Sequence, residues 1–430
     1  MALTLLSQPR IRLAMLCLLY VAQGLPFGFV TVALAAHLAA GGADAAAVGG
    51  VIAMAVLPWS FKWAWGPVVD SGRFASLGRR RPWIMIAQTL MIITAALIAW
   101  VPAGNIALLG WMVLVHNVFV GLQDVAVDAL AIDMLEGRDR ERASGMMFGS
   151  SYFGTFLGGA GLGIVAARHG VATAVTVMAC VQAVVLTLVT AIRERPGDRW
   201  LPGLGPPWAA DAGGAPSIQP LGLVDMSRSL LRGMTRRDAA LAAAAAVGVK
   251  ILPAALEVLM MVHLIDRLGW SQERYSTVTG GGGILMGLLA SIAGGYVSGR
   301  IGPRTTAIVS NTLLGIAWLV FAAVARHWEN PNVIVAWVAA GTICQAMTTV
   351  SLFAIFMRVA SPAVAATQFT ASMALMNLAT SLGSWLAGPI GAFVDAPTAF
   401  LMAGLLQPLA GLILPRVHAS PSLQSSLQKE

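Results

Sequence analysis

The chain has 430 residues, of which 57% are hydrophobic and only 11% are charged, and its mean hydropathy is +0.78. Because a soluble domain carries about twice that share of charged residues, this composition excludes a soluble protein and predicts a polytopic membrane protein. The net charge of +8 does not indicate a nucleic-acid partner, since the basic residues gather in loops between apolar segments, where membrane orientation explains them.

Hydropathy windows of about 19 residues predict twelve membrane spans. They are expected at 11–39, 46–68, 83–101, 106–131, 143–166, 171–192, 238–264, 275–299, 304–325, 332–357, 363–388 and 397–414. The loops after spans 2, 4, 6 and 8 hold most of the arginines, so both termini are predicted to lie in the cytoplasm. The expected fold class is an all-α membrane protein with twelve transmembrane helices.

The segment between spans 6 and 7 differs from the rest of the chain. It is rich in Pro and Gly and carries seven arginines, so it is too polar to cross a membrane and is expected to link two halves. The predicted organisation is a six-helix bundle at 1–192, a cytoplasmic linker at 193–237, a second six-helix bundle at 238–416, and a cytoplasmic tail at 417–430.

An internal repeat relates the two halves. The pattern Gly66-x-x-x-Asp70, which precedes a Gly-Arg-Arg turn, returns 229 residues later at Gly295-x-x-x-Gly299, without the aspartate. We expect this basic turn to act as a latch between the halves on the cytoplasmic side, with Asp70 pairing with arginines; a simpler explanation is that the arginines only set orientation. The latch residues are Gly66, Asp70, Arg79, Arg80, Arg81, Arg300 and Arg304.

Glycines of span 5 repeat in span 11 at an offset of 225, as Gly158 and Gly383 show, and small residues at such positions let helices approach closely. The glycine run 280–283 in span 8 has no Lys-Ser/Thr after it, so it predicts close packing or flexing and not a phosphate loop.

Five charged residues fall inside predicted spans and away from the first two residues of each, and charges at membrane depth are costly and usually functional. Asp124 and Asp128 lie four residues apart and share a face of span 4, and Lys62 of span 2 is expected to partner them. Lys250 and Glu257 lie seven apart on one face of span 7. We assign all five to proton coupling or gating, although each pair could instead be a purely structural ion pair.

Polar residues inside the spans are candidates for substrate binding, although hydrogen bonding between helices is their commoner fate. These candidates are Gln23, His116, Asn117, Gln345 and Asn377. Gln23 is favoured because it precedes Gly24-Leu25-Pro26, where a span can unwind. The cysteines lack metal-site spacing, and no nucleotide or nucleophile motif is found, so no metal, cofactor or enzymatic activity is expected.

Three stretches resemble the AmpG-type branch of the major facilitator superfamily: Gln23 to Gly28, Leu57 to Lys62 with the following Gly-Pro-x-x-Asp, and Gln123 to Ala129. That branch includes muropeptide permeases, acetyl-CoA transporters and siderophore permeases. The resemblance implies secondary transport of a bulky, polar, often anionic solute, driven by the proton gradient in bacterial members, and Lys62, Asp70, Asp124 and Asp128 match the branch position by position.

The expected function is therefore proton-coupled uptake by a monomer in a bacterial inner membrane, with a small-molecule substrate and no nucleic acid. Residues 78–83, Gly-Arg-Arg-Arg-Pro-Trp, also resemble sugar–proton symporters, which keeps a glycoside substrate open. The sequence is also compatible with an exporter of amphiphilic compounds and, least readily, with a non-transporting signalling or assembly protein.

Overall fold

The structure is a computed structural model that describes residues 4–5, 8–70, 75–102, 104–135, 137–195, 198–199, 235–359 and 365–417. Within these ranges the chain is almost entirely helical, and the only extended pairing is a single bridge between Thr4 and Arg193. Most of the expected linker, most of the expected tail and Arg73 of the basic turn lie outside the described residues.

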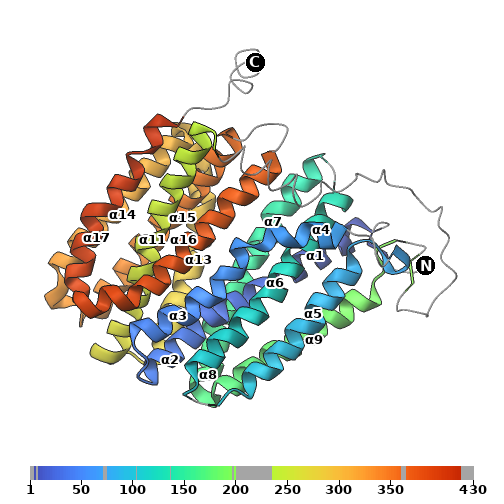
Figure 1. The fold of residues 1–430 in the computed structure, drawn as a ribbon, viewed down its shortest axis with the longest axis horizontal. Coiled ribbons are helices and arrows are strands. Elements are labelled where there is room, and N and C mark those ends of the chain that lie inside the picture. The colour runs from blue at the N-terminus through green and yellow to red at the C-terminus, as the bar shows by residue number, and fades with distance from the viewer. Residues whose placement is uncertain are drawn as a thin grey trace, which may run out of the picture.

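The described residues up to 199 form what we call the N-terminal half, coloured blue to green in Figure 1. Its helices are α1 (Pro9–Gly28), η1 (Phe29–Leu34), α2 (Ala35–Ala40), α3 (Ala45–Val56), η2 (Leu57–Ser60), η3 (Lys62–Trp65), α4 (Gly66–Asp70), η4 (Ala75–Leu77), α5 (Arg81–Ala99), α6 (Ile106–Met134), α7 (Gly137–Phe156), η5 (Leu157–Gly161), α8 (Leu162–His169) and α9 (Val171–Ala191).

Residues from 235 onward form the C-terminal half, coloured yellow-green to red in Figure 1. Its helices are α11 (Arg237–Val262), η6 (His263–Arg267), α12 (Gln272–Tyr275), η7 (Ser276–Gly283), α13 (Ile284–Ile301), α14 (Pro303–Ala323), η8 (Ala325–His327), α15 (Pro331–Val359), α16 (Ala365–Phe393), α17 (Ala396–Gly411) and η10 (Leu414–Arg416).

The described helices agree with a multi-span membrane protein. Ten of them are long and apolar enough to cross a membrane, and an eleventh span results if the bent pair Ala45–Ser60 and Lys62–Asp70 is counted as one. The 29-residue helix α16 lies where the span at 363–388 was expected, so the helices are consistent with twelve spans.

Span 2 corrects the sequence prediction of one continuous helix over 46–68. The helix breaks at Phe61 and its two parts are bent by 45°. Pro58 lies at the start of η2 and has no backbone N–H to donate, which weakens the α-helical ladder at this point, and short 3₁₀ turns follow it.

The repeat appears in the packing of the two halves. Helix α1 crosses the span formed by α7 and η5, where a Cβ at Gly158 in η5 would collide with the backbone carbonyl of Leu25. Helix α11 crosses α16 in the same way, where a Cβ at Gly383 would collide with the carbonyl of Ile251. Gly383 lies 225 residues after Gly158, and Ile251 lies 226 after Leu25. The predicted close approach at these two glycines is therefore confirmed.

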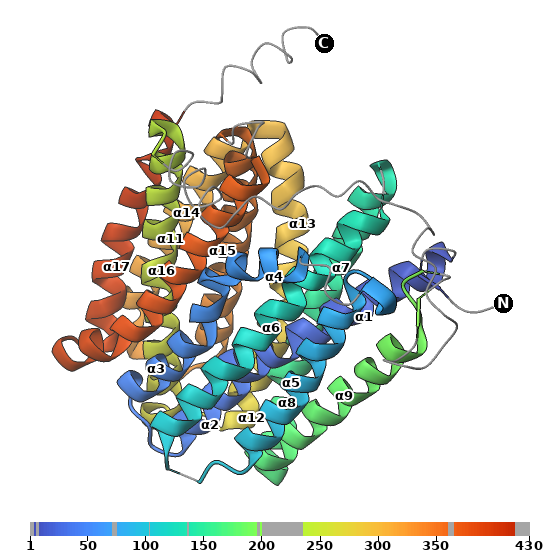
Figure 2. The same ribbon diagram turned by 45° about the vertical axis from the view of Figure 1, so that its right-hand side comes forward.

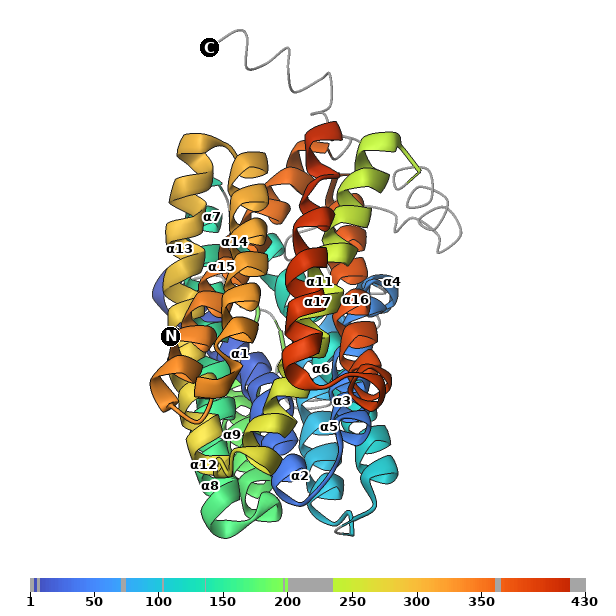
Figure 3. The ribbon, with the colours of Figure 1, turned by 90° about the vertical axis from the view of Figure 1, so that its left-hand side faces the viewer.

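Among the described residues, the hydrophobic core that draws on both halves lies at one end of the bundle. We call the end that carries Pro9, Ala191 and Arg237 the terminus end, and the opposite end, where α2, α8 and α12 lie together (Figure 3), the far end. At the far end one hydrophobic core draws on both halves, with Ala36 and Ile52 beside Leu259. At the terminus end each half has a core of its own.

Two further features close the far end. Helix α3 packs along α16 (Figure 2), and Ser381 of α16 donates a hydrogen bond of 2.8 Å to the carbonyl of Ala53. The glycine run predicted to mark close packing does so, because a Cβ at Gly280 would lie 2.7 Å from the backbone of Gly159 in the other half. The halves are therefore in intimate contact at this end.

Candidate functional site

The break in span 2 brings Lys62 to α6. Its Nζ donates to Oδ2 of Asp124 at 2.7 Å, and the two side chains are only 12% and 9% exposed. The ammonium also lies 5.8 Å from the ring centre of Trp59, within the range of a cation–π contact. The predicted pairing of Lys62 with an aspartate of span 4 is thus present in the structure.

The second aspartate of α6 has a different partner. Asp128, one turn from Asp124, accepts a hydrogen bond from the hydroxyl of Tyr20 on α1. We call Tyr20, Lys62, Asp124 and Asp128 the acidic cluster; it joins three separate spans of the N-terminal half. Its two carboxylates face one lysine, so at full ionisation the cluster carries one uncompensated negative charge, which a single proton would neutralise.

The charges of span 7 do not form the structural ion pair that the sequence also allowed. Lys250 Nζ donates to the hydroxyl of Thr349 at 2.9 Å, and Glu257 accepts from the amide of Gln345 at 2.9 Å. Seven residues of α-helix separate the two charges by about 10 Å along the axis, and both side chains turn to α15 instead.

The polar candidates are divided between the interior of a half and the contact surface between the halves, which we call the seam and which runs along α3 and η2 on one side and α11 and α16 on the other. His116 is 1% exposed and its Nδ1 lies 2.8 Å from the hydroxyl of Thr94, so it lies within the packing of the N-terminal half. Asn117 is equally buried, and its side-chain oxygen has no hydrogen-bond partner among the described residues. Gln345 contacts Glu257, and Asn377 is half-buried on α16, which packs against η2.

Gln23 corrects a second expectation. The chain does not unwind at Gly24-Leu25-Pro26: helix α1 continues to Gly28 and includes Pro26. Gln23 is 4% exposed, and its amide nitrogen has no partner in the described part of the chain.

The latch residues form a network within the N-terminal half. The guanidinium of Arg80 donates to Asp70 and, at 2.8 Å, to Asp133 at the end of α6. Arg79 lies 3.6 Å from Asp70 and 3.8 Å from Asp133. The predicted pairing of Asp70 with arginines is therefore confirmed.

The expected contact of this turn with the opposite half is not seen for Arg79 and Arg80 among the described residues, and it stays a prediction. All their described partners precede residue 195, because the bend in span 2 carries α4 toward α6. In the C-terminal half, Arg300 stacks on Tyr296 of its own helix, at 4.3 Å from the ring centre, and Arg304 lies in the first turn of α14. Gly66 opens α4, and no described atom lies within 4 Å of where its Cβ would be.

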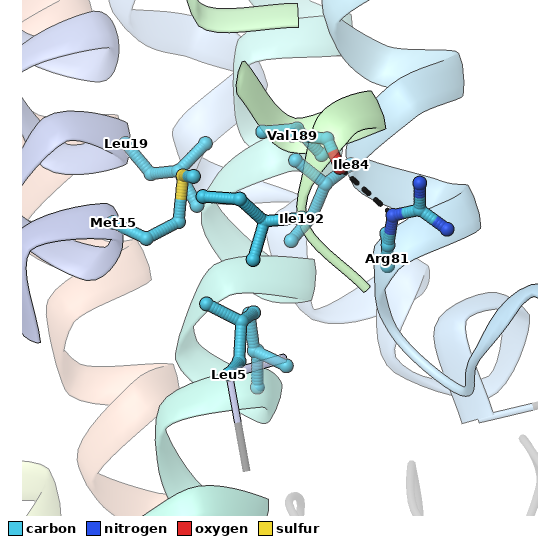
Figure 4. A pocket seen from close by; sticks show the side chains of 8 residues that line it. Leu5, Met15, Leu19, Arg81, Ile84, Val189 and Ile192 are labelled. Atoms are coloured by element: carbon cyan, nitrogen blue, oxygen red, sulfur yellow. Dashed lines mark hydrogen bonds between the residues drawn. The ribbon is translucent and has the colours of Figure 1, made fainter. Parts of the chain in front are cut away.

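Arg81 is buried (1% exposed) and ties the basic turn to the segment after α9. It donates to the carbonyl of Val189 at 2.8 Å (Figure 4) and to that of Arg199 at 3.1 Å. The carboxylate of Glu194 accepts the backbone N–H of both Arg80 and Arg81, at 2.9 and 3.0 Å. The small pocket beside Arg81 in Figure 4 is lined otherwise by apolar side chains, so it offers no polar site for a ligand.

Tyr20, Trp59 and Glu194 are the site residues that sequence reasoning missed. Tyr20 could have been proposed from the sequence, because it lies about one turn before Gln23 in a predicted span and the chain has only four tyrosines. Among the described residues, no group of three or more His, Cys, Asp and Glu side chains could hold a metal ion.

Comparisons with known proteins agree with this fold. Residues 12–158 match the family model described as Acetyl-coenzyme A transporter 1. The Anhydromuropeptide permease of Escherichia coli (strain K12) is 23% identical over 437 residues, which cover 96% of this chain and 80% of that protein.

Two solved structures share the architecture. A D-xylose-proton symporter superposes with a TM-score of 0.69 at 15% identity, covering 94% of this chain and 97% of the symporter. The nucleoside transporter NupG gives 0.68 at 14% identity, covering 94% and 99%. Together with the apolar helices, these relatives support a multi-pass protein of a bacterial inner membrane. The chain is a secondary transporter, not an enzyme, with the major facilitator superfamily fold and an AmpG-like sequence.

Proposed function

We propose that this transporter couples proton entry to uptake of a bulky polar solute by alternating access, with no cofactor and as a monomer. The observation that carries the proposal is the acidic cluster, in which one buried lysine serves two neighbouring carboxylates. Charges at this depth are expensive to maintain, so a structural role alone explains them poorly.

The cluster suits proton coupling because its charge can change by one without loss of hydrogen bonds. Asp128 can be protonated while Lys62 and Asp124 stay paired, since the Tyr20 hydroxyl can accept as well as donate. Protonation changes the net charge of the acidic cluster from −1 to 0 and so changes the free energy of burying it. The equilibrium between inward- and outward-facing conformations then shifts toward the conformation in which the protonated cluster is more stable.

The contacts between the halves support an inward-facing state. The sequence predicts that the termini are cytoplasmic, which puts the far end, with its shared core, on the outer side of the membrane. Two polar links also cross the halves there: Arg168 binds Glu273 at 2.6 Å, and His37 lies 3.1 Å from Gln272. These links must separate when the far end opens.

The substrate class rests on the relatives. One of them is an Anhydromuropeptide permease and the matched family model is described as an acetyl-coenzyme A transporter, so both names point to large polar solutes. We therefore place a muropeptide-like or siderophore-like solute first.

Uptake into proteoliposomes with an imposed pH gradient tests the proposal. Labelled anhydromuropeptide, a siderophore and a disaccharide are offered with the gradient inward, outward or absent. We expect accumulation of one solute only with the inward gradient, loss of it in Asp128→Asn, and retention in Asp266→Asn, a matched control at an exposed aspartate. Accumulation that ignores the gradient contradicts the coupling, and movement only with the reversed gradient indicates an exporter.

A further inference from the structure

Two charges on α11 remain without an opposite charge. Among the residues that the structure describes, neither Lys250 nor Glu257 has an ion-pair partner; each makes one hydrogen bond to a neutral side chain of α15. An ammonium has three donors and a carboxylate about four acceptor positions, so most of their capacity is unused. Holding a charge at membrane depth with so little compensation is costly.

The two charges form the ends of one polar ladder. Lys250 donates to the hydroxyl of Thr349, that hydroxyl donates to the backbone carbonyl of Gln345 at 2.7 Å, and the Gln345 amide donates to Glu257. Pro253 lies between the charges and frees the carbonyl of Val249, but this oxygen accepts a hydrogen bond of 3.2 Å from a buried glutamine. The carbonyl freed by Pro253 thus has a hydrogen-bond partner, and the hydrogen-bonding positions that remain open belong to the Lys250 ammonium and the Glu257 carboxylate.

The ladder lies beside the seam between the halves. Val258, next to Glu257, packs toward α3, with its Cγ1 3.5 Å from where a Cβ of Gly49 would lie. Phe27 of α1 packs against the core that both halves share, as do Leu252 and Cys344, which lie on the same two helices as the ladder. The Glu257 side chain is exposed and that of Lys250 is half-buried, so packing does not close off either charge.

We propose that this ladder binds a zwitterionic solute of short-peptide size, with its carboxylate at the ammonium of Lys250 and its ammonium at the carboxylate of Glu257 and the side-chain oxygen of Gln345. The α-carbons of Lys250 and Glu257 lie about 10 Å apart along the helix axis, and side chains that extend in parallel toward α15 keep about this spacing between their charges. Two charge-assisted hydrogen bonds of about 2.8 Å leave roughly 5 Å between the ligand charges, which lies between the lengths of one and two extended residues. The inference rests on the proposed transport function and specifies one end of its substrate.

Binding to the purified full chain, measured by calorimetry without a gradient, tests this inference. The probes are Ala-Ala, its N-acetyl derivative, its C-terminal amide, and the doubly blocked form. We expect Ala-Ala to bind and each single block to weaken binding at least about tenfold, since each leaves one charge of the ladder unpaired.

The variants assign each end of the ladder. Glu257→Gln should lose the preference for a free amine and keep that for a free carboxylate, while Lys250→Gln should do the reverse. Asp266→Asn should bind as wild type. If Glu257→Gln does not fold, Gln345→Leu replaces it, because it removes the amide that holds the Glu257 carboxylate.

The inference is overturned if all four probes bind equally well or if none binds. It is also overturned if the variants keep the wild-type preference for a free amine and a free carboxylate. None of these results affects the proton-coupling proposal, whose test is gradient-driven accumulation of a solute of any charge. Loss of that accumulation with intact zwitterion binding would instead refute the coupling alone.

Discussion

The pairing of Lys62 with Asp124 makes a quantitative prediction for a double-mutant cycle. The single changes are Lys62→Met and Asp124→Leu, which replace each side chain by an apolar one of similar length, and the third variant combines them. Each single change leaves one charge inside the membrane-spanning bundle without its 2.7 Å partner, whereas the combined change leaves neither.

The magnitude follows from burial. The two side chains are 12% and 9% exposed, so water cannot replace the lost partner, and breaking a buried pair costs about 3–5 kcal/mol. Asp124→Leu should lie at the low end of this range, because Asp128 is one turn away on the same face and can take the lysine. Replacing both partners by packed apolar groups is often close to neutral. We therefore expect the double variant to be at least about 2 kcal/mol more stable than the sum of the single losses predicts.

The assay is thermal or denaturant unfolding of purified protein in one detergent, followed by tryptophan fluorescence, with transport measured in parallel. Stability should recover in the double variant, while gradient-driven uptake should fall in both single variants, because losing Lys62 or Asp124 alone changes the net charge of the cluster both before and after Asp128 takes up a proton. Additive losses of stability would refute the reasoning, since they would mean that the two charges do not interact in the folded protein.

Three further predictions concern other parts of the fold. Glu194→Ala removes the acceptor for the first N–H groups of α5 and should cost about 1–3 kcal/mol in unfolding, with a smaller loss in Glu194→Gln; equal losses would contradict the capping role. Burial raises the pKa of Asp198 to about 6; the nearby Glu194 charge adds to this rise and a backbone hydrogen bond opposes it. Between pH 4 and 6 the native carboxyl therefore keeps a proton that the unfolded chain loses. Stability should therefore fall as the pH rises through this range, by on the order of 2 kcal/mol, and Asp198→Asn should flatten the profile; an unchanged slope of melting temperature against pH would exclude this carboxyl. Gly280→Val should force the far end apart at Gly159 and reduce uptake, whereas Gly282→Val, in open space, should transport normally; equal effects would show that the close contact is unimportant.

The sequence was sufficient for those features that depend on composition or on helix periodicity. Apolar windows predicted the spans, and the spacing of Asp124 and Asp128 placed both on one face of a helix toward Lys62. The offset shared by Gly158 and Gly383 predicted where helix backbones approach, because only glycine fits such a crossing. These predictions use only hydropathy, helix periodicity and the internal repeat, and the contacts between distant segments did not change their outcome.

The remaining features depend on contacts between distant segments. The break at Phe61 and the continuity of α1 through Pro26 have opposite outcomes although each span contains a proline, so the residue type alone does not decide them. Glu194 lies 114 residues from the N–H of Arg80 that it caps, and no local pattern marks such a partner. Lys250 and Glu257 share a face as predicted, but their hydrogen bonds go to α15, which sequence spacing cannot show.

The broken span 2 explains how a charge change in one half could reach the other. Its second part holds Lys62 against Asp124, while its first part, η2, packs directly on α16 of the C-terminal half. The carbonyl of Ala53, one turn before η2, accepts the hydrogen bond of Ser381 from the same helix. The acidic cluster and α16 are therefore joined by a few residues of one bent segment, which under the proposed coupling would carry a shift of Lys62 from Asp124 toward Asp128. Because the core that the halves share in the described part of the chain lies at the far end, such a movement would act on the contacts that have to separate before the bundle can open outward.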